Sequence, residues 1–500
     1  MKKTQWETEV AVIGAGFGGL GAALSLSERG RSVCLFETLN YPGGCASTFQ
    51  REGFRFESGA TLFSGFSPNQ LFGRWISRYQ LDVEIDWLDP VVELRTPELH
   101  LPVGRERGDF ARRLCALPGA PRERLERFFR YQKEIADILW EVLDSPDLLP
   151  PLDFRCLWRH GTRAARYLPF LRLVGRPLVH VLERFGLKDF QPLRIALDAL
   201  CQITVQCGLE EAEAPFALSC MDYYYRGTGH VRGGIGVLSH ELVRAIQTQG
   251  GDVRYATRVK SIVREGERWR LETRRGTCIA KAVVANLLPQ DLGRLLGSLP
   301  PSLKAPLRRV ESGWGACMLY RVVRAPAEES DEPHHLEMVQ DPGQKMTEGN
   351  HIFASISGKD DPGRVPEAIP EHDRLRTMSV STHIPLSELA TLSEEEQGRR
   401  VEEVQQRMRR GLEDLAPEWS DTVYELPASP RTFERFTGRH LGYVGGNPRR
   451  SGIGHYLKLG PLQVRPGLWM VGDTVFPGQS TLATATGGLC VAKAVDRTLS

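Results

Sequence analysis

The feature that most constrains the fold is the stretch VIGAGFGGLGAAL at residues 12–24. It spaces Gly14, Gly16 and Gly19 as G-x-G-x-x-G between an apolar run of strand type and a segment with helical spacing that stops at Gly30. In such a strand, turn and helix, glycines allow a tight turn, close approach of the backbone to a pyrophosphate, and packing of the helix on the strand. The N-terminus of the helix then offers unpaired N–H groups to the anion. The stretch therefore predicts a dinucleotide-binding unit of Rossmann type.

Two neighbouring segments extend this unit. The next apolar run, RSVCLFE, ends at Glu37, about 20 residues beyond the glycines, where a carboxylate accepts both hydroxyls of an adenosine ribose and disfavours a 2′-phosphate. Gly43 and Gly44 follow Pro42 in a turn that lets the backbone approach a ligand. We expect these residues, together with Gly18 inside the glycine motif, to contact the nucleotide.

The C-terminal block LWMVGDTVFPGQSTL indicates which nucleotide is bound. Gly472 and Asp473 end an apolar strand, a turn follows, and a helix is expected to begin near Ser480 or Thr481. An aspartate there can accept hydrogen bonds from ribityl hydroxyls, and the helix N-terminus can face the N1–C2=O edge of a flavin, which gains negative charge on reduction. The two ends of the chain together favour FAD. Gln479 and Ser480, in the turn that must face the flavin ring, are the candidates closest to the chemistry.

Two strands in the middle of the chain supply further candidate cofactor contacts. The segment RVKSIV contains Val259, and the run KAVVAN ends at Asn286. Both follow the glycine turn and helix of RGGIGVLSHEL, so the strand, turn and helix pattern returns there. We expect Val259 and Asn286 to lie at the cofactor.

Composition and cysteine usage narrow the class of protein. With 500 residues the chain can form a large core and about two or three domains. Lys and Arg number 64 against 62 Asp and Glu, so charge does not favour nucleic acid as a partner. The ten cysteines contain no C-x-x-C pair and no zinc ligand set occurs, which predicts reduced thiols and no metal site. We find no secretory signal and no spanning segment, and therefore expect a cytoplasmic protein.

The spacing of apolar residues changes along the chain and indicates two domains. Helical spacing dominates from about 70 to 220, which predicts a mostly helical insertion, and strand patterns return from about 222. We expect an α/β protein, α+β overall, with a Rossmann-type FAD-binding domain of the glutathione-reductase/amine-oxidase kind and a mixed, partly helical substrate domain. The expected ranges are 1–68, 222–295 and 440–500 for the FAD-binding domain, and 69–221 and 296–439 for the substrate domain. In the latter, TMSVSTHI predicts a strand and residues 394–415 an amphipathic helix.

These motifs resemble a known family. The glycine motif, Glu37, PGG at 42–44, GFRFESGA, RGGIGVLSHEL, VVAN and VGDTVFPGQ are similar to segments of the phytoene desaturase, carotenoid isomerase and retinol saturase group of FAD flavoproteins. The resemblance covers most of the chain, is weakest from about 90 to 190, and is nearest to the carotenoid isomerases. Two segments depart from the pattern: STLATATGG replaces a more apolar run, and RGGIG replaces a glycine turn that commonly contains proline.

The resemblance implies an FAD-dependent enzyme that acts on a long hydrophobic isoprenoid or polyene. Two reactions stay open: desaturation, in which flavin N5 takes a hydride, and cis-trans isomerisation assisted by reduced flavin. Positioning and exclusion of water supply most of the rate in such chemistry, which agrees with the lack of a Ser/His/Asp pattern. A flavoprotein amine oxidase, and a non-enzymatic isoprenoid-binding protein of the GDP dissociation inhibitor type, are the alternatives.

Residues 154–182 predict contact with a membrane surface. They contain six arginines and no acid; Arg155, Arg159, Arg163 and Arg166 recur at helical spacing among apolar side chains. Such a basic amphipathic stretch can lie on anionic lipid, from which a polyene would enter; a solvated arginine face is the alternative. We therefore add peripheral contact with the inner face of the membrane to the expectations.

Overall fold

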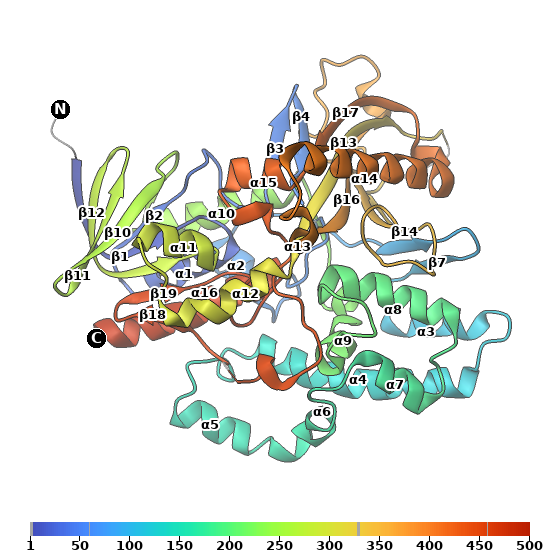
Figure 1. Cartoon of the computed structure of the whole chain (residues 1–500), viewed down its shortest axis with the longest axis horizontal. Helices are drawn as coiled ribbons and strands as arrows, with labels where there is room; N and C mark the ends of the chain where they lie inside the picture. The colour runs from blue at the N-terminus through green and yellow to red at the C-terminus, as the bar shows by residue number, and fades with distance from the viewer. Residues whose placement is uncertain (1–3, 60, 328–330, 458) are drawn as a thin grey trace.

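A sheet built from both ends and the middle of the chain forms one side of the molecule (left in Figure 1). The computed structural model describes residues 4–59, 61–327, 331–457 and 459–500. The strands of this sheet are β1 (Thr4–Ile13), β2 (Val33–Phe36), β9 (Asp252–Arg254), β10 (Val259–Glu265), β11 (Arg268–Thr273), β12 (Gly276–Ala285), β18 (Leu462–Arg465) and β19 (Leu468–Met470). The order is β10-β11-β12-β1-β2-β9, and β19 joins β12 with β18 beside it. Strand β1 pairs in parallel with both β2 and β12. The pairs β2–β9 and β12–β19 are also parallel, as in a Rossmann unit.

The second half of β1 is buried on both faces, which explains its continuous apolar sequence from Val10 to Ile13. Val10 and Val12 point into a core cluster with two helices, whereas Ala11 and Ile13 belong to the cluster on the opposite face. The two helices are α1 (Phe17–Ser27) and α10 (Ile235–Thr248), and the opposite face is covered by β10 and β11. A parallel strand covered on both sides reads as an uninterrupted apolar run instead of an alternating one.

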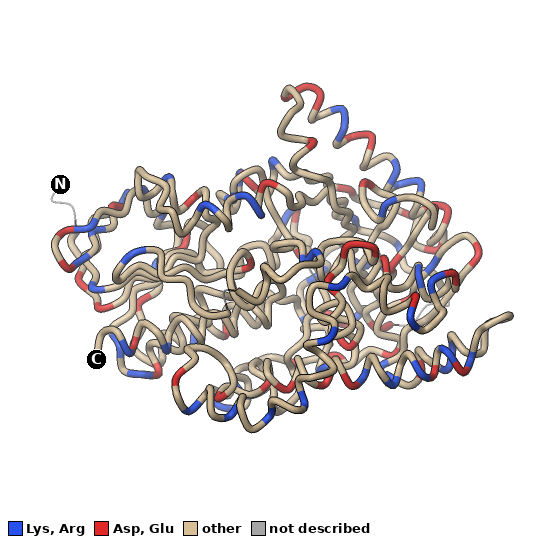
Figure 2. Tube along the Cα trace, turned by 60° about the horizontal axis from the view of Figure 1, so that its bottom comes forward, with Lys and Arg blue, Asp and Glu red and all other residues tan. Residues whose placement is uncertain are grey.

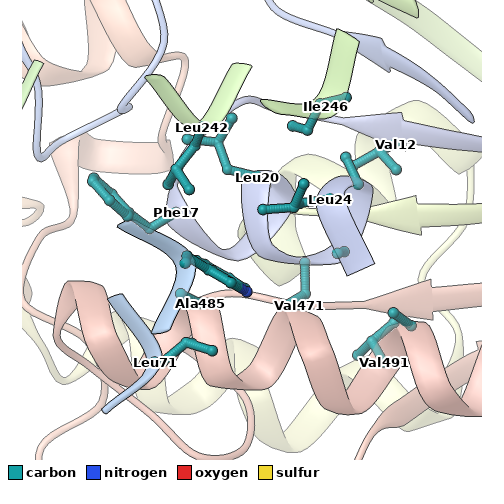
Figure 3. Close-up of a cluster of buried hydrophobic side chains, with 14 of the residues drawn as sticks. Val12, Phe17, Leu20, Leu24, Leu71, Leu242, Ile246, Val471, Ala485 and Val491 are labelled. Atoms are coloured by element: carbon teal, nitrogen blue, oxygen red, sulfur yellow. The ribbon is translucent and has the colours of Figure 1, made fainter. Parts of the chain in front are cut away.

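The first and last helices of the chain pack directly against each other. Helix α16 (Thr481–Leu499) packs along one side of α1, and Figure 3 shows Leu20 and Leu24 of α1 on the other side, toward Leu242 of α10. The backbones approach closely: a Cβ on Gly21 would lie 2.5 Å from the Ala485 carbonyl oxygen, and one on Gly488 would lie 2.4 Å from the Gly18 carbonyl oxygen. Small residues at the crossing therefore bring the glycine motif and the C-terminal turn together.

A second sheet and its helix form the upper right of Figure 1. Its order is β17-β13-β16-β15-β14-β6-β7, and α14 (Glu394–Leu415) packs on it through an apolar stripe. The strands are β6 (Val92–Arg95), β7 (His100–Val103), β13 (Trp314–Arg324), β14 (His334–Val339), β15 (His351–Ile356), β16 (Leu375–Pro385) and β17 (Thr422–Ala428). The predicted strand at 377–384 and helix at 394–415 are confirmed.

The predicted helical region is confirmed in its larger part and wrong between about 92 and 103. Helix α2 (Leu71–Tyr79) packs in the core that contains α1 and α16, whereas the core of the later helices lies at the lower right of Figure 1. These later helices are α3 (Arg107–Ala116), α4 (Arg122–Asp144), α5 (Phe154–Gly161), α6 (Leu168–Leu171), α7 (Leu178–Phe185), α8 (Gln191–Thr204) and α9 (Ala214–Cys220). However, β6 and β7 interrupt the region and pair parallel with β14 through β6. Their sequence VELR-TPEL-HLPV alternates around a turn, which favours a hairpin. The limits of the two domains stay a prediction.

The arginine-rich segment is not one continuous helix, which corrects the spacing argument. Helix α5 ends at Gly161, the short 3-10 turn η1 (Ala164–Tyr167) follows, and α6 begins at Leu168. Arg159 pairs with Asp147, and Arg163 and Arg166 pair with Glu141 of α4. Part of the positive charge is therefore neutralised within the protein, because the breaks in the helix turn these arginines toward acids outside the segment.

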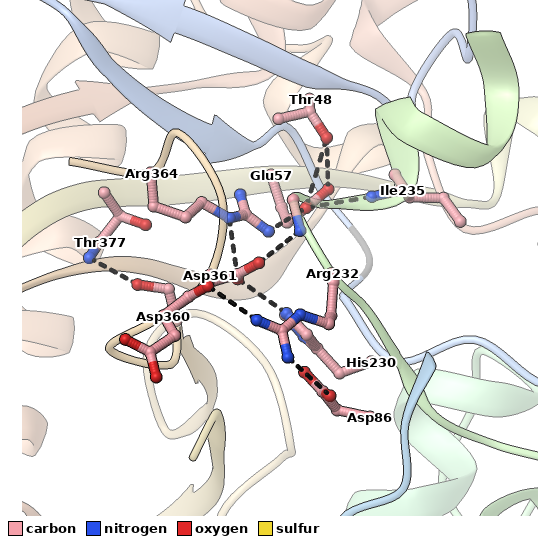
Figure 4. A network of polar contacts seen from close by, with 12 residues as sticks. Thr48, Glu57, Asp86, His230, Arg232, Ile235, Asp360, Asp361, Arg364 and Thr377 are labelled. Atoms are coloured by element: carbon pink, nitrogen blue, oxygen red, sulfur yellow. Dashed lines mark hydrogen bonds and ion pairs between the residues drawn. The ribbon is translucent and has the colours of Figure 1, made fainter. Parts of the chain in front are cut away.

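A buried ionic network joins three distant segments: residues 54–57, the turn before α10 and the loop before β16. Figure 4 shows Arg364, which lies in a loop of the second half of the chain, between Glu57 of β4 (Phe54–Glu57) and Asp361. Its guanidinium lies 2.6 Å from Glu57 Oε1 and 3.1 Å from Asp361 Oδ2, and His230 Nε2 lies 2.8 Å from the same Asp361 oxygen. Glu57 also accepts the N–H of Ile235 at the start of α10. The RGG turn is thus fixed by acids from two distant segments.

Charges elsewhere are distributed without a dominant sign. Figure 2 shows Lys and Arg interspersed with Asp and Glu along the outer elements, in agreement with the balanced composition. All ten cysteines lie in the described ranges and are free thiols, as the sequence predicts. Among the helices of the described ranges, none combines the length and the apolar character that a membrane span needs.

Candidate functional site

One large cavity runs between the two chain ends and into the helical region. Its volume is ≈1310 Å³. Thirteen of the fourteen residues that the sequence predicts at the cofactor line it, and they come from five separate parts of the chain. They are Gly14, Gly16, Gly18, Glu37, Gly43, Gly44, Val259, Asn286, Gly472, Asp473, Gln479, Ser480 and Thr481. The remaining one, Gly19, packs instead: a Cβ there would lie 1.9 Å from the Gly14 carbonyl oxygen.

The glycine turn is shaped by Asn286 as well as by its own backbone. Gly14 has φ +93°, which a side chain rarely adopts. Gly16 and Gly18 have ordinary φ values, but added Cβ atoms would lie 2.8 Å from Asn286 Nδ2 and 2.9 Å from Asn286 Oδ1. Asn286 follows β12, next to β1 in the sheet, and its Nδ2 donates to the Gly14 carbonyl at 3.4 Å. Asn286 therefore requires small residues in the turn that it covers.

Glu37 lies at the end of β2 beside the glycine turn. Its carboxylate accepts the N–H of Ala15 at 2.7 Å and that of Leu39 at 2.8 Å. The side chain is buried, which raises the pKa of Glu37, while these backbone N–H groups act in the opposite direction. Glu37 is thus oriented toward the cavity by its own neighbours, as a ribose-binding acid must be.

Asp473 closes the other end of the predicted cofactor site. It follows β19, and its Oδ2 accepts from Arg439 Nη2 at 2.7 Å. Burial lowers the pKa of a guanidinium, but the charge of Asp473 outweighs it and the pKa of Arg439 is raised. Asp473 is therefore held in a fixed direction and keeps lone pairs for a hydroxyl in the cavity.

The turn before α16 ends in a strained cap. Ser480 has φ +84°, and its Oγ accepts the N–H of Ala483 at 3.0 Å as the N-cap of α16. The adjacent Gln479 donates from Nε2 to the Thr204 carbonyl at 2.7 Å, at the end of α8. The helix begins at Thr481, so its predicted start is confirmed. A positive φ at a residue other than glycine is typical of functional sites, and here it turns the helix N-terminus toward the cavity.

Buried polar atoms around the cavity have no hydrogen-bond partner within the described residues. Such atoms are rare in proteins, because leaving one unpaired costs about 1–3 kcal/mol. Those whose residues line the cavity include Thr61 Oγ1, Gln206 Oε1, Thr474 Oγ1, Gln479 Oε1 and Thr481 Oγ1. Their concentration along one cavity, partly on the C-terminal turn, fits a ligand with many polar atoms.

The far part of the cavity is apolar and reaches the helical region. Side chains of α4, α8 and α9 line it, together with residues 148–150, 152, 457 and 459–462; examples are Leu139, Leu149 and Ile203. The three consecutive tyrosines Tyr223–Tyr225 lie beside this part of the cavity. They form the 3-10 turn η2 (Tyr223–Tyr225), and Tyr223 and Tyr224 line the cavity.

Sequence reasoning missed a partly buried cluster beside the C-terminal turn. Arg449, His455 and Tyr456 line the cavity, Tyr456 stacks on Phe216 with ring centroids 5.6 Å apart, and Glu213 lies beside them. Burial and then the charge of Arg449 lower the pKa of His455 to about 4, so His455 is a neutral wall residue. The segment GGNPRR offered a signal, since two arginines next to a glycine pair lie close to the flavin turn in sequence.

The described residues contain no cluster of three or more His, Cys, Asp or Glu side chains that could hold a metal ion.

Comparisons with known proteins agree with this geometry. A family sequence model described as an NAD(P)-binding Rossmann-like domain matches residues 12–79. Prolycopene isomerase of Arabidopsis thaliana is 25% identical over 97% of this chain and 82% of its own length. A neurosporene-forming phytoene desaturase of Cereibacter sphaeroides and the human all-trans-retinol 13,14-reductase are each 26% identical over 51% of this chain, and over 47% and 42% of their own lengths.

Solved structures show the same fold. Putrescine oxidase, with putrescine bound, covers 99% of this chain and all of its own, with a TM-score of 0.63 and 15% identity. This likeness confirms the predicted fold class, a Rossmann-type domain of the amine-oxidase kind with a mixed second domain. The chain is thus a homologue of the prolycopene isomerases, phytoene desaturases and retinol reductases, the group that its motifs indicate.

Proposed function

We propose that the protein is an FAD-dependent oxidoreductase or isomerase that acts on a long, hydrophobic polyene. The observation that carries this proposal is the single cavity, which joins a polar part at the two chain ends to an apolar part between α4, α8 and α9. A polar cofactor and an apolar substrate would meet inside one protein-enclosed space. The relatives over most of this chain, the prolycopene isomerases, favour a carotenoid-like substrate.

The residues present fit FAD. The glycine turn and the N-terminus of α1 offer N–H groups to a pyrophosphate, and Glu37 offers a carboxylate to a ribose. At the other end, Asp473 would accept from the ribityl chain, and the N-terminus of α16 would face the ring. The unpaired atoms of Thr474, Gln479 and Thr481 would gain partners. When bound, the flavin would supply the hydride acceptor or donor.

The chain itself positions the polyene and excludes water. Apolar side chains surround the far part of the cavity, while Tyr223 Oη is directed to the Leu62 carbonyl at 2.8 Å and so keeps its ring against the wall. Such an environment holds an extended chain by burial, at about 25 cal/mol per Å² of apolar surface. Gln479 and Ser480 remain the candidates at the reacting centre, because their turn lies at the junction of the two cavity parts.

Two observations weigh against the alternatives. An amine oxidase would bring an ammonium group beside the positively charged Arg449, which lines the same cavity and lacks an ion-pair partner among the described residues. A binding protein without flavin would have no use for the polar cradle, in which Gly14, Glu37 and Asp473 keep the geometry of a dinucleotide site.

The function is tested with purified protein in two steps. Oxidised-flavin absorbance, and FAD released on denaturation, are expected first. The protein is then incubated with prolycopene, phytoene and all-trans-retinol, both oxidised and under anaerobic reducing conditions. Isomerisation leaves the mass unchanged, desaturation removes two hydrogens and saturation adds two.

Ile203→Trp, which would fill the apolar part of the cavity, should keep FAD and lose conversion, whereas the surface change Val263→Trp should keep both. A yellow protein that converts none of the three polyenes would contradict the proposal.

We further propose that the cavity opens onto a lipid surface. The segments around its apolar end, α5 to α6 and the loop after η7 (Ile453–His455), carry exposed apolar side chains, with Phe154 86%, Trp158 63% and Leu457 72% exposed. Leu152, Leu171, Leu457 and Leu459 of this rim also line the cavity. Arg155 and Arg172 in the same segment make no ion pair with a described carboxylate, so they are available to anionic headgroups.

Vesicle sedimentation tests this surface. We expect stronger binding to phosphatidylglycerol/phosphatidylcholine vesicles than to phosphatidylcholine alone, and a large loss of binding in Phe154→Ser/Trp158→Ser. Phe436→Ser removes an aromatic ring that is 51% exposed on α15 (Pro430–Thr437) and serves as the matched control. Equal binding by wild type and the double variant would refute lipid docking at this rim.

A further inference from the structure

Arg449 is a partly buried cation beside the C-terminal turn. Its Nη2 donates to the Pro477 carbonyl, its Nη1 lies 3.4 Å from His455 Nδ1, and its guanidinium carbon lies 4.7 Å from the centre of the Phe216 ring. One side of the side chain faces the cavity. Protein atoms therefore surround the charge everywhere except toward the ligand space.

No described carboxylate compensates this charge. No acid oxygen of the described residues lies within 4.0 Å of the Arg449 guanidinium. The charge of Glu213 acts on Arg449, but its carboxylate accepts the N–H of Gly175 and burial raises the pKa of Glu213 to about 7. His455 is neutral, and Arg309, which lines the same cavity, adds a like charge. Burial and then Arg309 lower the pKa of Arg449, so the protein by itself disfavours its charge.

The neighbouring Arg439 is a partly buried arginine of this site whose charge has a carboxylate partner. Arg439 lies 2.7 Å from Asp473 Oδ2 and also donates to the Tyr443 carbonyl. Arg449 has a carbonyl, a neutral imidazole and an aromatic ring instead. Burying a charge without a partner is expensive, and a retained one is expected to meet its counter-charge in a ligand.

The position of Arg449 identifies which part of the ligand it meets. Its Nη2 lies against the turn 477–479: a Cβ on Gly478 would be 2.2 Å from that nitrogen. The same turn leads into the Ser480 cap and the N-terminus of α16, whose partial positive charge faces the cavity. Arg449 and the helix N-terminus thus place two positive groups on one turn.

We propose that Arg449 holds the negative charge of the flavin ring and thereby stabilises the reduced, anionic cofactor. This inference rests on the proposed FAD site. The neutral oxidised ring leaves Arg449 without a counter-charge, and the two-electron-reduced ring supplies one. Arg449 would therefore bias the bound cofactor toward reduction, the state that a reduced-flavin isomerase needs at rest.

Sulfite and the midpoint potential provide tests that need no substrate. Sulfite bonds through its lone pair to N5 of oxidised flavin and leaves the negative charge on the N1–C2=O edge, so its affinity reports a positive group there. In Arg449→Gln we expect sulfite to bind at least about tenfold more weakly and the midpoint potential of the flavin to fall. The reason is that an opposite charge at close range shifts a pKa by about one unit or more. Arg449→Lys should retain part of both effects. Arg450→Gln removes an adjacent arginine that pairs with Glu211 on the outside and should change neither.

The outcomes separate this inference from the proposed function. Unchanged sulfite affinity and potential in Arg449→Gln, with FAD bound, would overturn the role of Arg449 even if polyenes are still converted. Loss of binding of all-trans-retinoic acid in that variant, with sulfite affinity unchanged, would assign the counter-charge to a substrate carboxylate and would also overturn it. A sulfite effect in a protein that converts no polyene would support Arg449 and refute the function.

Discussion

At the scale of single residues, the backbone contacts of Glu37 make the stability of the protein sensitive to replacing one carboxylate oxygen of this side chain by an NH₂ group. Both of its oxygens accept N–H groups, from Ala15 and Leu39. In Glu37→Gln one of these N–H groups would face an NH₂ donor, which should lower the free energy of unfolding by about 1–3 kcal/mol and release FAD more readily. Urea unfolding and the flavin-to-protein absorbance ratio after gel filtration measure the two effects. Glu7→Gln, at a side chain 65% exposed, is the control, and equal FAD retention in both variants would argue against Glu37 as a cofactor contact.

At the scale of elements, the crossing of α1 and α16 decides whether the two halves of the cofactor site meet. A side chain at position 488 would collide with the Gly18 carbonyl and the Ala22 N–H. We expect Gly488→Val to lower the free energy of unfolding by about 1–3 kcal/mol through overpacking, and to reduce FAD content because the helices must separate. Gly398→Ala lies within α14 with no atom near its added Cβ and should be neutral or stabilise by up to about 1 kcal/mol. If Gly488→Val bound FAD with wild-type affinity and stability, close helix contact would not be needed.

At the scale of the whole molecule, the network around Asp361 joins distant segments of the chain and makes the stability of the protein depend on pH. Asp361 and Arg364 have side chains 1% and 4% exposed. Burial would raise the pKa of Asp361, but Arg364 and His230 outweigh it and lower the pKa below its usual value. The carboxylate therefore stabilises the fold at pH values above about 3.9, its unfolded pKa, and this contribution is lost as the pH falls toward the folded pKa.

The matching variant is Asp361→Asn (Figure 4). We expect it to lower the free energy of unfolding at pH 7 by about 3–5 kcal/mol, because Arg364 loses one of its two buried partners. The difference from wild type should narrow as the pH is lowered from 5 toward 3, measured by urea unfolding at each pH. Asp189→Asn, at an exposed surface position, should follow the wild type throughout. A difference that stays constant with pH would mean that the charge of Asp361 is not what stabilises the junction.

The sequence by itself determined the parts of the protein that local chemistry dictates. Gly14 needs a positive φ, Ser480 and Thr481 mark a helix start, and the apolar run of β1 requires cover on both faces, so each can be inferred from neighbouring residues. The strands β6 and β7 could not be placed, because their pairing with β14 joins segments more than two hundred residues apart. Only the tertiary structure showed that Asn286 covers the glycine turn and that Arg449 lies partly buried with no described carboxylate in ion-pair contact. Both facts depend on which distant backbone segments meet. Local sequence preference determines where a helix or strand forms, whereas the burial of a charge depends on all the segments that surround it.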